Sequence, residues 1–256
     1  MSPSVAVADL DVAAFKRDGY LIVRGLASQD ICERVRQEIN ESLTPLRGPA
    51  EFEVDVQYPG APKDRFAEGA STPRRLLHAY GRHPVFREWG TSEEIKSYLQ
   101  RLMGHEQPML AQSHHNCVMT KYPGYSSMTS WHQDNRYWRY DRPELVSVWL
   151  AVADEYDENG ALQVIPGTHK QEYDPGRLDR DLFLRTDLEE NQALLDQAKV
   201  VELSAGDVLF FHSQVFHAAG RNMSDQVKTS LVFTYHDADN HPIPATKSSS
   251  FPSIPL

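Results

Sequence analysis

The segment Ser130-Trp131-His132-Gln133-Asp134-Asn135 carries the pattern on which the interpretation of this chain depends. Residues two apart on a β-strand point to the same face of a sheet, so His132 and Asp134 would present an imidazole and a carboxylate side by side. Two such groups cannot complete a metal site, and a third ligand has to come from a distant strand. His217 lies 85 positions after His132 (217 − 132), just beyond a predicted strand over residues 208–212, and is the preferred third ligand.

Two histidines and one carboxylate on one face of an octahedron leave three positions open for a cosubstrate and O2, which is typical of mononuclear non-haem iron(II) oxygenases. A lone His-x-Asp pair is a weak signal, because a hydrogen-bonded surface pair has the same sequence. His212, at the end of the strand before His217, is the rival third ligand. The surrounding sequence therefore has to discriminate between these alternatives.

From about Pro108 onward, short apolar or alternating runs are separated by turn residues. This texture predicts many short strands, and hence a β-sandwich or jelly roll with the early helices packed outside one sheet. The expected fold class is mainly β with flanking helices. The predicted strands cover residues 109–121, 146–153, 162–166, 200–203, 208–212 and 228–236, with turns at 122–124, 158–160, 166–168 and 205–207.

The first third of the chain is predicted to be helical, around one short strand at residues 20–23. Asp11 is expected to cap a short helix that ends near Gly19, and Ser28 to cap a second. A third helix is expected to start at Thr91, which has capping-box spacing to Glu94, and to end at Gly104. The second helix has an apolar stripe at every fourth residue, formed by Ile31, Val35, Ile39 and Leu43. Residues 45–73 are predicted to be a long loop.

We expect residues 1–256 to form a single domain. It consists of a helical N-terminal part (about 1–107), a jelly-roll core (about 108–240) and a loose C-terminal tail (241–256). Residues 174–197 are polar and are predicted to form an excursion with a little helix. Cys32 and Cys117 are too few for a disulfide framework and are expected to be reduced, buried thiols.

The formal net charge of −10 argues against partners that are polyanions, whether nucleic acid or an anionic membrane surface. Residues 1–10 lack the basic region and uninterrupted apolar stretch of a signal peptide. No run approaches the roughly 18 apolar residues of a membrane span. We therefore expect a cytoplasmic protein whose partner is a small-molecule substrate; the sequence predicts no oligomeric state.

Six blocks, in this order and spacing, give the chain its family resemblance. They are Phe15-Lys16-Arg17-Asp18-Gly19-Tyr20, Trp131-His132-Gln133-Asp134, Val148-Trp149-Leu150-Ala151, residues 158–169 (ENGALQVIPGTH), Gly206-Asp207 and residues 217–224. With them the chain resembles the phytanoyl-CoA dioxygenase family of iron- and 2-oxoglutarate-dependent oxygenases. The resemblance implies a double-stranded β-helix, or jelly-roll barrel, with iron(II) inside its mouth. It also implies that 2-oxoglutarate is decarboxylated to succinate and CO2 while O2 is split, with hydroxylation of the substrate as the usual outcome.

Carried onto this sequence, the resemblance makes His132, Asp134 and His217 the iron ligands and places Trp149 against 2-oxoglutarate. Ordinary core packing is the alternative for Trp149. His169 matches the family as a turn residue. The context of His217 (Ala-Ala-Gly-Arg-Asn-Met-Ser) favours it over His212.

One residue departs from the family pattern. Eleven positions after the distal histidine the family has an arginine that pairs with the far carboxylate of 2-oxoglutarate, and here that position is Lys228. Arginine grips a carboxylate with two parallel hydrogen bonds, whereas lysine offers a point charge. Ser230 would share the face of Lys228 and add a hydroxyl. A solvated lysine at a strand end is the alternative, and Arg221 is a possible substitute cation.

Residues near the motif give weaker indications. Gln112 and His114 share one strand parity and could face the barrel interior, whereas Lys121 has the opposite parity if the strand is regular. His115 is interpreted as structural, and Asn135 as orienting either substrate or its own loop. The aromatic residues Trp131, Tyr137, Trp138 and Tyr140 suit either a ring-bearing substrate or a packed barrel rim.

Three functional hypotheses follow. The leading one is a 2-oxoglutarate-dependent hydroxylase of a free small molecule, because no basic cluster suits the phosphates of coenzyme A. The carboxylate of Asp134 argues against halogenation, since related halogenases have a small residue there that admits chloride. The second is a cupin-like metal enzyme that does not use 2-oxoglutarate, and the missing arginine favours it. The third is a non-catalytic relative that binds metal or ligand.

Overall fold

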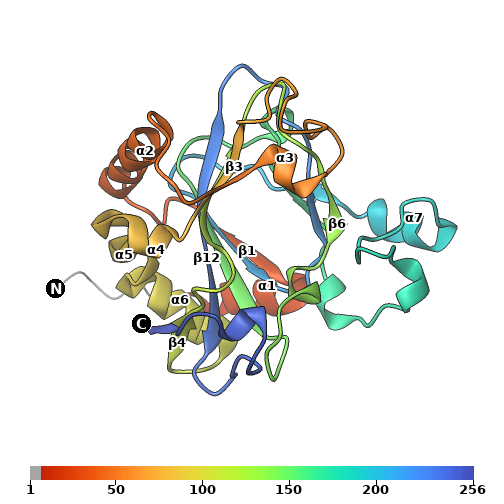
Figure 1. Cartoon of the computed structure of the whole chain (residues 1–256). Coiled ribbons are helices and arrows are strands. Elements are labelled where there is room, and N and C mark those ends of the chain that lie inside the picture. Colours follow the sequence, from red (N-terminus) through yellow and green to blue (C-terminus); the bar gives the residue numbers. More distant parts are fainter. Residues whose placement is uncertain (1–6) are drawn as a thin grey trace.

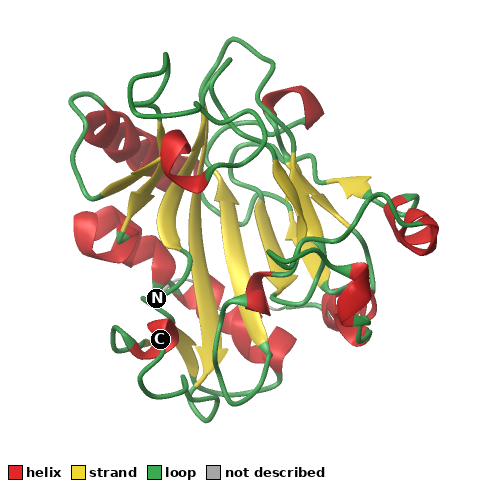
Figure 2. Cartoon of the chain, turned by 45° about the vertical axis from the view of Figure 1, so that its right-hand side comes forward, coloured by secondary structure: helices red, strands yellow, loops and turns green. Residues whose placement is uncertain are grey.

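The structure is a computed structural model that describes residues 7–256, so part of the segment analysed for a signal peptide lies outside the described residues. Two antiparallel sheets face each other across the barrel, and helices cover the outer face of the larger sheet (Figure 1). Figure 2 shows the same two layers after a turn of the molecule. The predicted jelly-roll fold with N-terminal helices packed on one sheet is confirmed.

The larger sheet has nine strands and the smaller one four. The main path of the larger sheet is β1 (Tyr20–Val23), β10 (Val208–His212), β7 (Leu145–Ala151), β12 (Lys228–Asp237), β5 (Asn116–Lys121), β3 (Pro73–Leu77) and β2 (Ala50–Phe52). At its margin, β4 (Pro108–Leu110) pairs with β12 and with β13 (Ile254–Pro255). The smaller sheet runs β6 (Thr129–His132), β11 (His217–Ala219), β8 (Leu162–Val164) and β9 (Lys199–Val200).

Capping residues at their ends set where the helices begin and end. The Ser28 hydroxyl accepts a hydrogen bond from the Ile31 amide, which confirms the predicted cap. The first helix starts earlier than predicted, with Asp9 and Asp11 in its first turn. The helices of this layer are α1 (Asp9–Asp18), α2 (Gln29–Leu43), α4 (Ala79–Arg82), α5 (Pro84–Gly90) and α6 (Glu93–Met103).

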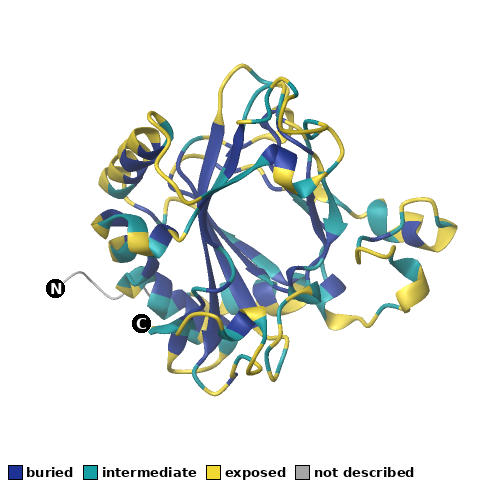
Figure 3. Cartoon of the chain, viewed as in Figure 1, coloured by how far each residue is buried: buried dark blue, intermediate teal, exposed yellow. Residues whose placement is uncertain are grey.

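The two larger of three apolar clusters in the described part of the chain hold the layers together. One fills the space between the helices and the larger sheet and includes Val35, Ile39 and Phe210. The other fills the barrel between the two sheets and includes Trp149, Leu162 and Val232. All seven residues of β7 are buried, because this strand is covered on both faces. The neighbouring β12, labelled in Figure 1, is buried along its whole length in the same way (Figure 3). Strand β7, which carries Trp149, is therefore anchored from both sides.

Several local predictions were wrong. Ser92, not Thr91, caps α6, because Thr91 already ends α5, which the sequence analysis missed. The predicted loop 45–73 contains β2 and the short helix α3 (Glu53–Val56). The predicted loose tail is wrong: Ser248 is buried and β13 pairs with β4, so backbone hydrogen bonds hold the segment. The polar excursion does contain one short helix, α7 (Glu189–Leu195), which projects at the right of Figure 1.

No helix among residues 7–256 is long and apolar enough to cross a membrane.

Gly19 joins α1 to β1 and cannot be replaced without strain. Its φ of 79° is left-handed, and an added Cβ would lie 2.4 Å from both His169 Nδ1 and Val215 Cγ2. We expect Gly19→Ala to lower the free energy of unfolding by about 2–4 kcal/mol, since a left-handed backbone and an overpacked contact both disfavour it. Gly25→Ala is the matched control: φ is 60° but nothing lies within 4 Å, so only the smaller backbone cost applies. Urea denaturation measures both, and equal losses would contradict the packing argument.

Candidate active site

The predicted ligand triad is assembled by one pair of neighbouring strands. His132 ends β6, His217 begins β11, and the two residues are direct cross-strand partners. Asp134 Oδ1 lies 3.7 Å from His132 Nε2 and 3.6 Å from His217 Nε2. All three side chains are buried. Metal–ligand bonds of about 2 Å each span such separations, so one ion between these three atoms is sterically allowed.

Backbone carbonyls hold both imidazoles in a ligating orientation. Nδ1 of His132 lies 2.8 Å from the Ser130 carbonyl oxygen, and Nδ1 of His217 lies 3.0 Å from that of Val215. Each Nδ1–H donates to its carbonyl, which leaves the lone pair of Nε2 directed at the centre of the triad. Burial, followed by the neighbouring His217, holds the pKa of His132 well below its ordinary value. The neutral form that binds metal is thereby favoured.

Asp134 reaches the site in a different way from the one predicted. Strand β6 ends at His132, and Asp134 instead begins a 3₁₀ turn (Asp134–Arg136). The side chain converges on the histidines nevertheless, because the turn folds back toward β11. Its Oδ2 is buried and has no hydrogen-bond partner among the described residues. A buried carboxylate oxygen without a donor is costly unless a cation meets it, so the residues present fit a metal ion.

The rival ligand His212 lies elsewhere. Its Nδ1 accepts a hydrogen bond from the Gln214 amide, and its ring packs 5.4 Å from the ring of His169. Both rings line a cavity near α1 and α6 that none of the three triad residues borders. Burial lowers the pKa of His212 to about 4. The structure therefore brings His217, and not His212, to the triad.

Two cavities meet at the triad. The inner one, about 60 Å³, lies within the barrel and is bordered by Trp149, Lys121 and Lys228 as well as the triad. The outer one, about 470 Å³, also borders His132 and Asp134 and opens between aromatic side chains. Arg74 and Arg75 border both cavities. This arrangement offers a small compartment with charged side chains at its border behind the metal position and a larger one in front of it.

Lys228, Ser230 and Trp149 converge on a residue that the sequence analysis did not single out. Glu155 Oε2 accepts a hydrogen bond from Lys228 Nζ at 2.9 Å. Glu155 Oε1 accepts from Ser230 Oγ at 2.6 Å and from Trp149 Nε1 at 2.9 Å. Lys228 is thus a buried, paired lysine, not a solvated one. No pattern in the sequence indicated Glu155, because acidic residues in turns are ordinarily exposed.

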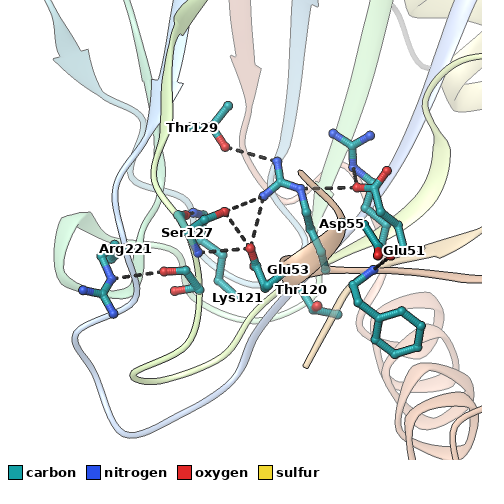
Figure 4. A network of polar contacts seen from close by, with 12 residues as sticks. Glu51, Glu53, Asp55, Thr120, Lys121, Ser127, Thr129 and Arg221 are labelled. Atoms are coloured by element: carbon teal, nitrogen blue, oxygen red, sulfur yellow. Dashed lines mark hydrogen bonds and ion pairs between the residues drawn. The ribbon is translucent and has the colours of Figure 1, made fainter. Parts of the chain in front are cut away.

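A second polar cluster closes the side of the barrel (Figure 4). The Arg74 guanidinium donates to Ser127 Oγ at 3.1 Å and to Thr129 Oγ1 at 3.2 Å, and its Nε lies 3.3 Å from Glu51 Oε1. Glu53, fully buried, accepts from the amide and hydroxyl of Ser127. This cluster seals the barrel wall beside the candidate metal position.

Arg75 is different from its neighbour. Its Nε lies 3.6 Å from Glu51 Oε1, yet its guanidinium makes no hydrogen bond within residues 7–256. It borders both cavities and is about a quarter exposed, at 27% of the side chain. No pattern in the sequence indicated Arg75, because β3 begins where the predicted loop 45–73 ends and was not predicted as a strand.

The inner cavity has an excess of one positive charge when Lys121 is protonated, that is, below its pKa of about 7. Four cations border it and three carboxylates pair with them (4 − 3 = 1), with Asp134 reserved for a metal. The cations are Arg74, Arg75, Lys121 and Lys228, and the carboxylates are Glu51, Glu53 and Glu155. In a chain of net charge −10, this local excess favours an anionic ligand inside the barrel.

Residues 15–230 match the family model described as phytanoyl-CoA dioxygenase. The chain belongs to the phytanoyl-CoA dioxygenase family. Phytanoyl-CoA dioxygenase domain-containing protein 1 of Danio rerio is 24% identical over 291 residues, which covers 96% of this chain and 98% of the relative. The peroxisomal phytanoyl-CoA dioxygenase of Homo sapiens is 24% identical over 242 residues, or 89% of this chain and 68% of the human protein.

Solved structures agree with the fold of this family member. The epimerase SnoN, crystallised with Fe3+, α-ketoglutarate and nogalamycin RO, superposes with a TM-score of 0.73 at 21% identity, covering 92% of this chain and 86% of SnoN. EctD from S. alaskensis gives a TM-score of 0.73 at 17% identity, covering 95% of this chain and 81% of EctD. At these identities the likeness establishes the fold.

Other predicted residues fall into two groups. Tyr137 and Trp138 border the outer cavity, with Gln112, His114 and His115. Trp131 and Tyr140 do not: Trp131 packs beside Phe216, and the Tyr140 ring lies against His236. Arg221 donates to the carbonyls of Ser126 and Gly124, which is a turn role and not a substitute for Lys228. Asn135 borders neither cavity, and its backbone N–H donates to the Ser213 carbonyl.

His115 lies closer to the site than its structural interpretation suggested. Its Nδ1 is 3.5 Å from Asp134 Oδ2, the carboxylate oxygen that has no hydrogen-bond partner among the described residues. Its ring packs edge-on against Trp138. His115 thus links the metal position to the wall of the outer cavity.

Lys121 faces the inner cavity, which the parity argument did not predict. Residues 111–115 interrupt the predicted strand between β4 and β5, so alternation counted from Gln112 does not reach Lys121. Its Nζ donates to the carbonyls of Ser127 at 2.9 Å and Gly220 at 2.5 Å. Burial, followed by the charge of Lys228, lowers the pKa of Lys121 to about 7.

This pKa has a consequence for stability. Between about pH 7 and the ordinary lysine value of 10.5, the unfolded chain binds the proton that the folded chain releases, so stability attributable to Lys121 rises with pH in that window. Lys121→Met removes the contribution. We compare the free energy of unfolding of the variant with that of wild type by urea denaturation. The difference in favour of the variant should be about 2 kcal/mol larger at pH 6.5 than at pH 9. A difference in stability between variant and wild type that does not change with pH would contradict the lowered pKa of Lys121. The other charged groups around Lys121 are Arg74, Glu53 and Arg221.

Proposed function

We propose that this protein is an iron(II)- and 2-oxoglutarate-dependent dioxygenase that hydroxylates a small organic substrate and releases succinate and CO2. The observation that carries the proposal is the buried triad of His132, Asp134 and His217, whose ligand atoms all lie within 4.8 Å of one another. A facial set of two histidines and one carboxylate leaves open positions that suit iron(II) and O2 chemistry. Iron(II), when bound, would supply O2 activation and chelation of the 2-oxo acid.

The chain's own residues have defined roles in this proposal. The carbonyls of Ser130 and Val215 orient the two imidazoles, and Asp134 supplies the charged ligand. The single excess positive charge of the inner cavity complements the distal carboxylate of 2-oxoglutarate. Arg75 is available to this carboxylate, because no carboxylate hydrogen-bonds to it among the described residues, and Lys121 adds a positive charge below its pKa of about 7. The apolar lining of the barrel excludes bulk water from the same compartment.

The outer cavity is the proposed substrate site. Its volume of about 470 Å³ falls in the usual range for small-molecule pockets, and aromatic side chains form its walls. Tyr58, Tyr137, Trp138 and Phe251 are these aromatic residues. They support a substrate with a ring or an extended apolar portion, held directly in front of the metal position.

Hydroxylation is the finer part of the proposal, because family folds support several outcomes. SnoN is described as an epimerase and SnoK as a carbocyclase. Turnover under 18O2 discriminates between them: hydroxylation places one labelled oxygen in the product and one in succinate. Labelled succinate together with an unlabelled product would show that the enzyme catalyses an oxidation other than hydroxylation. Metal-dependent turnover without succinate would support the cupin-like alternative that does not use 2-oxoglutarate.

A further inference from the structure

Glu155 is held in an unusual place for a carboxylate. It follows β7 and is 2% exposed. Its backbone pairs with that of Leu203, with N–H···O distances of 2.7 and 2.9 Å, so the local chain direction is fixed. The side chain consequently points into the barrel and not to solvent. A buried carboxylate needs a specific set of donors to be tolerated.

Those donors are the residues that the sequence predicted for the cosubstrate: Trp149 and the position of Lys228 from the family resemblance, and Ser230 from its shared strand face. Both Glu155 oxygens accept hydrogen bonds, one from Lys228 on one side and two from Ser230 and Trp149 on the other. The Lys228 and Glu155 side chains are 4% and 1% exposed, so the pair is desolvated. The positive charge of Lys228 is therefore already neutralised by the chain itself.

We propose that Glu155 is a specificity-determining residue, an internal carboxylate that competes with the distal carboxylate of a 2-oxo acid for Lys228 and Ser230. The inference rests on the proposed function. A second carboxylate entering the inner cavity meets a lysine that is paired and a negative charge beside it. Affinity for dicarboxylic 2-oxo acids is thereby lowered, while a monocarboxylic 2-oxo acid, which has no distal charge, is unaffected.

Glu155→Gln tests this directly. The amide keeps the shape of the side chain, but with its oxygen on Trp149 and Ser230 its NH2 group faces Lys228, donor against donor. Lys228 then lacks a counterion until a ligand carboxylate supplies one. In anaerobic titrations of the iron(II)-loaded protein, followed by the visible charge-transfer absorption, we expect the Kd for 2-oxoglutarate to fall about tenfold or more. The Kd for 2-oxobutyrate should stay within about twofold.

Glu158→Gln is the matched control, because Glu158 is exposed and only three residues away. It undergoes the same chemical change and should leave both dissociation constants as in wild type. An unchanged Kd for 2-oxoglutarate in Glu155→Gln would overturn the proposal. So would an increased Kd, which would mean that Glu155 positions Lys228 for the cosubstrate instead of competing for it.

A second variant guards against misfolding of the first. Glu155→Gln combined with Lys228→Met buries no charge at this position. Because Lys228 contributes no net charge in wild type, we expect the double variant to bind 2-oxoglutarate within about threefold of wild type. A loss greater than tenfold would show that Lys228 was available to the cosubstrate, and would overturn the proposal. If wild type itself gives no absorption band at any 2-oxoglutarate concentration, the proposed function fails instead.

Discussion

His217→Ala is expected to abolish stoichiometric iron(II) binding and with it 2-oxoglutarate turnover. His217 is the ligand supplied from the second strand of the β6–β11 pair, and its Nε2 lies 3.6 Å from Asp134 Oδ1. Without it, His132 and Asp134 leave an incomplete set. The loss should exceed the roughly 10–100-fold typical of residues that only orient a ligand. Metal analysis after anaerobic loading and desalting, together with succinate formation, measures both effects.

His212→Ala is the control for this prediction. His212 is also buried near a strand end and was the rival ligand in the sequence, but its Nδ1 is taken by the Gln214 amide. The His212→Ala variant should therefore bind iron(II) with the wild-type stoichiometry. Retention of iron by His217→Ala, or its loss from His212→Ala, would contradict the assigned triad.

Lys228→Met is expected to lower the free energy of unfolding by about 3–5 kcal/mol, because it leaves the buried carboxylate of Glu155 without a counterion. The pair is 2.9 Å apart and nearly fully desolvated, so solvent cannot replace the lost partner. If Lys228 were a solvated lysine at a strand end, its replacement would change the free energy of unfolding little. Urea denaturation at neutral pH measures the difference.

The double variant with Glu155→Gln separates charge from packing. Removing both members of a buried ion pair is often nearly neutral, so the double variant should recover most of the stability lost in Lys228→Met. A loss below about 1 kcal/mol in the single variant would contradict the buried pair. Additive losses in the double variant would show that packing, not charge, explains the effect.

The sequence predicted the parts of this molecule that depend on periodicity and on ligand chemistry. Strand and turn patterns after Pro108 gave the jelly roll, and the stripe that includes Val35 and Ile39 gave the buried face of α2. The family blocks also fixed the relative positions of His132 and His217, which the structure brings together as cross-strand partners. These features are local or carried by motifs, so they do not require knowledge of tertiary contacts.

Other features depend on tertiary structure and could not be predicted. Strands β2 and β3 lie in a polar, proline-containing region. They form because β3 pairs with β5 and β2 pairs with β3. The break between β4 and β5 reversed the expected orientation of Lys121. Glu155 illustrates the limit most clearly, since its burial results from backbone pairing with Leu203, 48 positions away (203 − 155). No local pattern indicates that a glutamate in a turn will neutralise a lysine on β12.

The measurement that tests the central claim most directly is anaerobic titration of the apoprotein with iron(II) and then 2-oxoglutarate, monitored by visible absorption. We predict a weak metal-to-ligand charge-transfer band that saturates at one 2-oxoglutarate per iron and is absent from His132→Ala and His217→Ala. That result would place both iron and cosubstrate at the triad. Stoichiometric iron binding with no such band at any 2-oxoglutarate concentration would contradict the account and favour a metal enzyme that does not use 2-oxoglutarate.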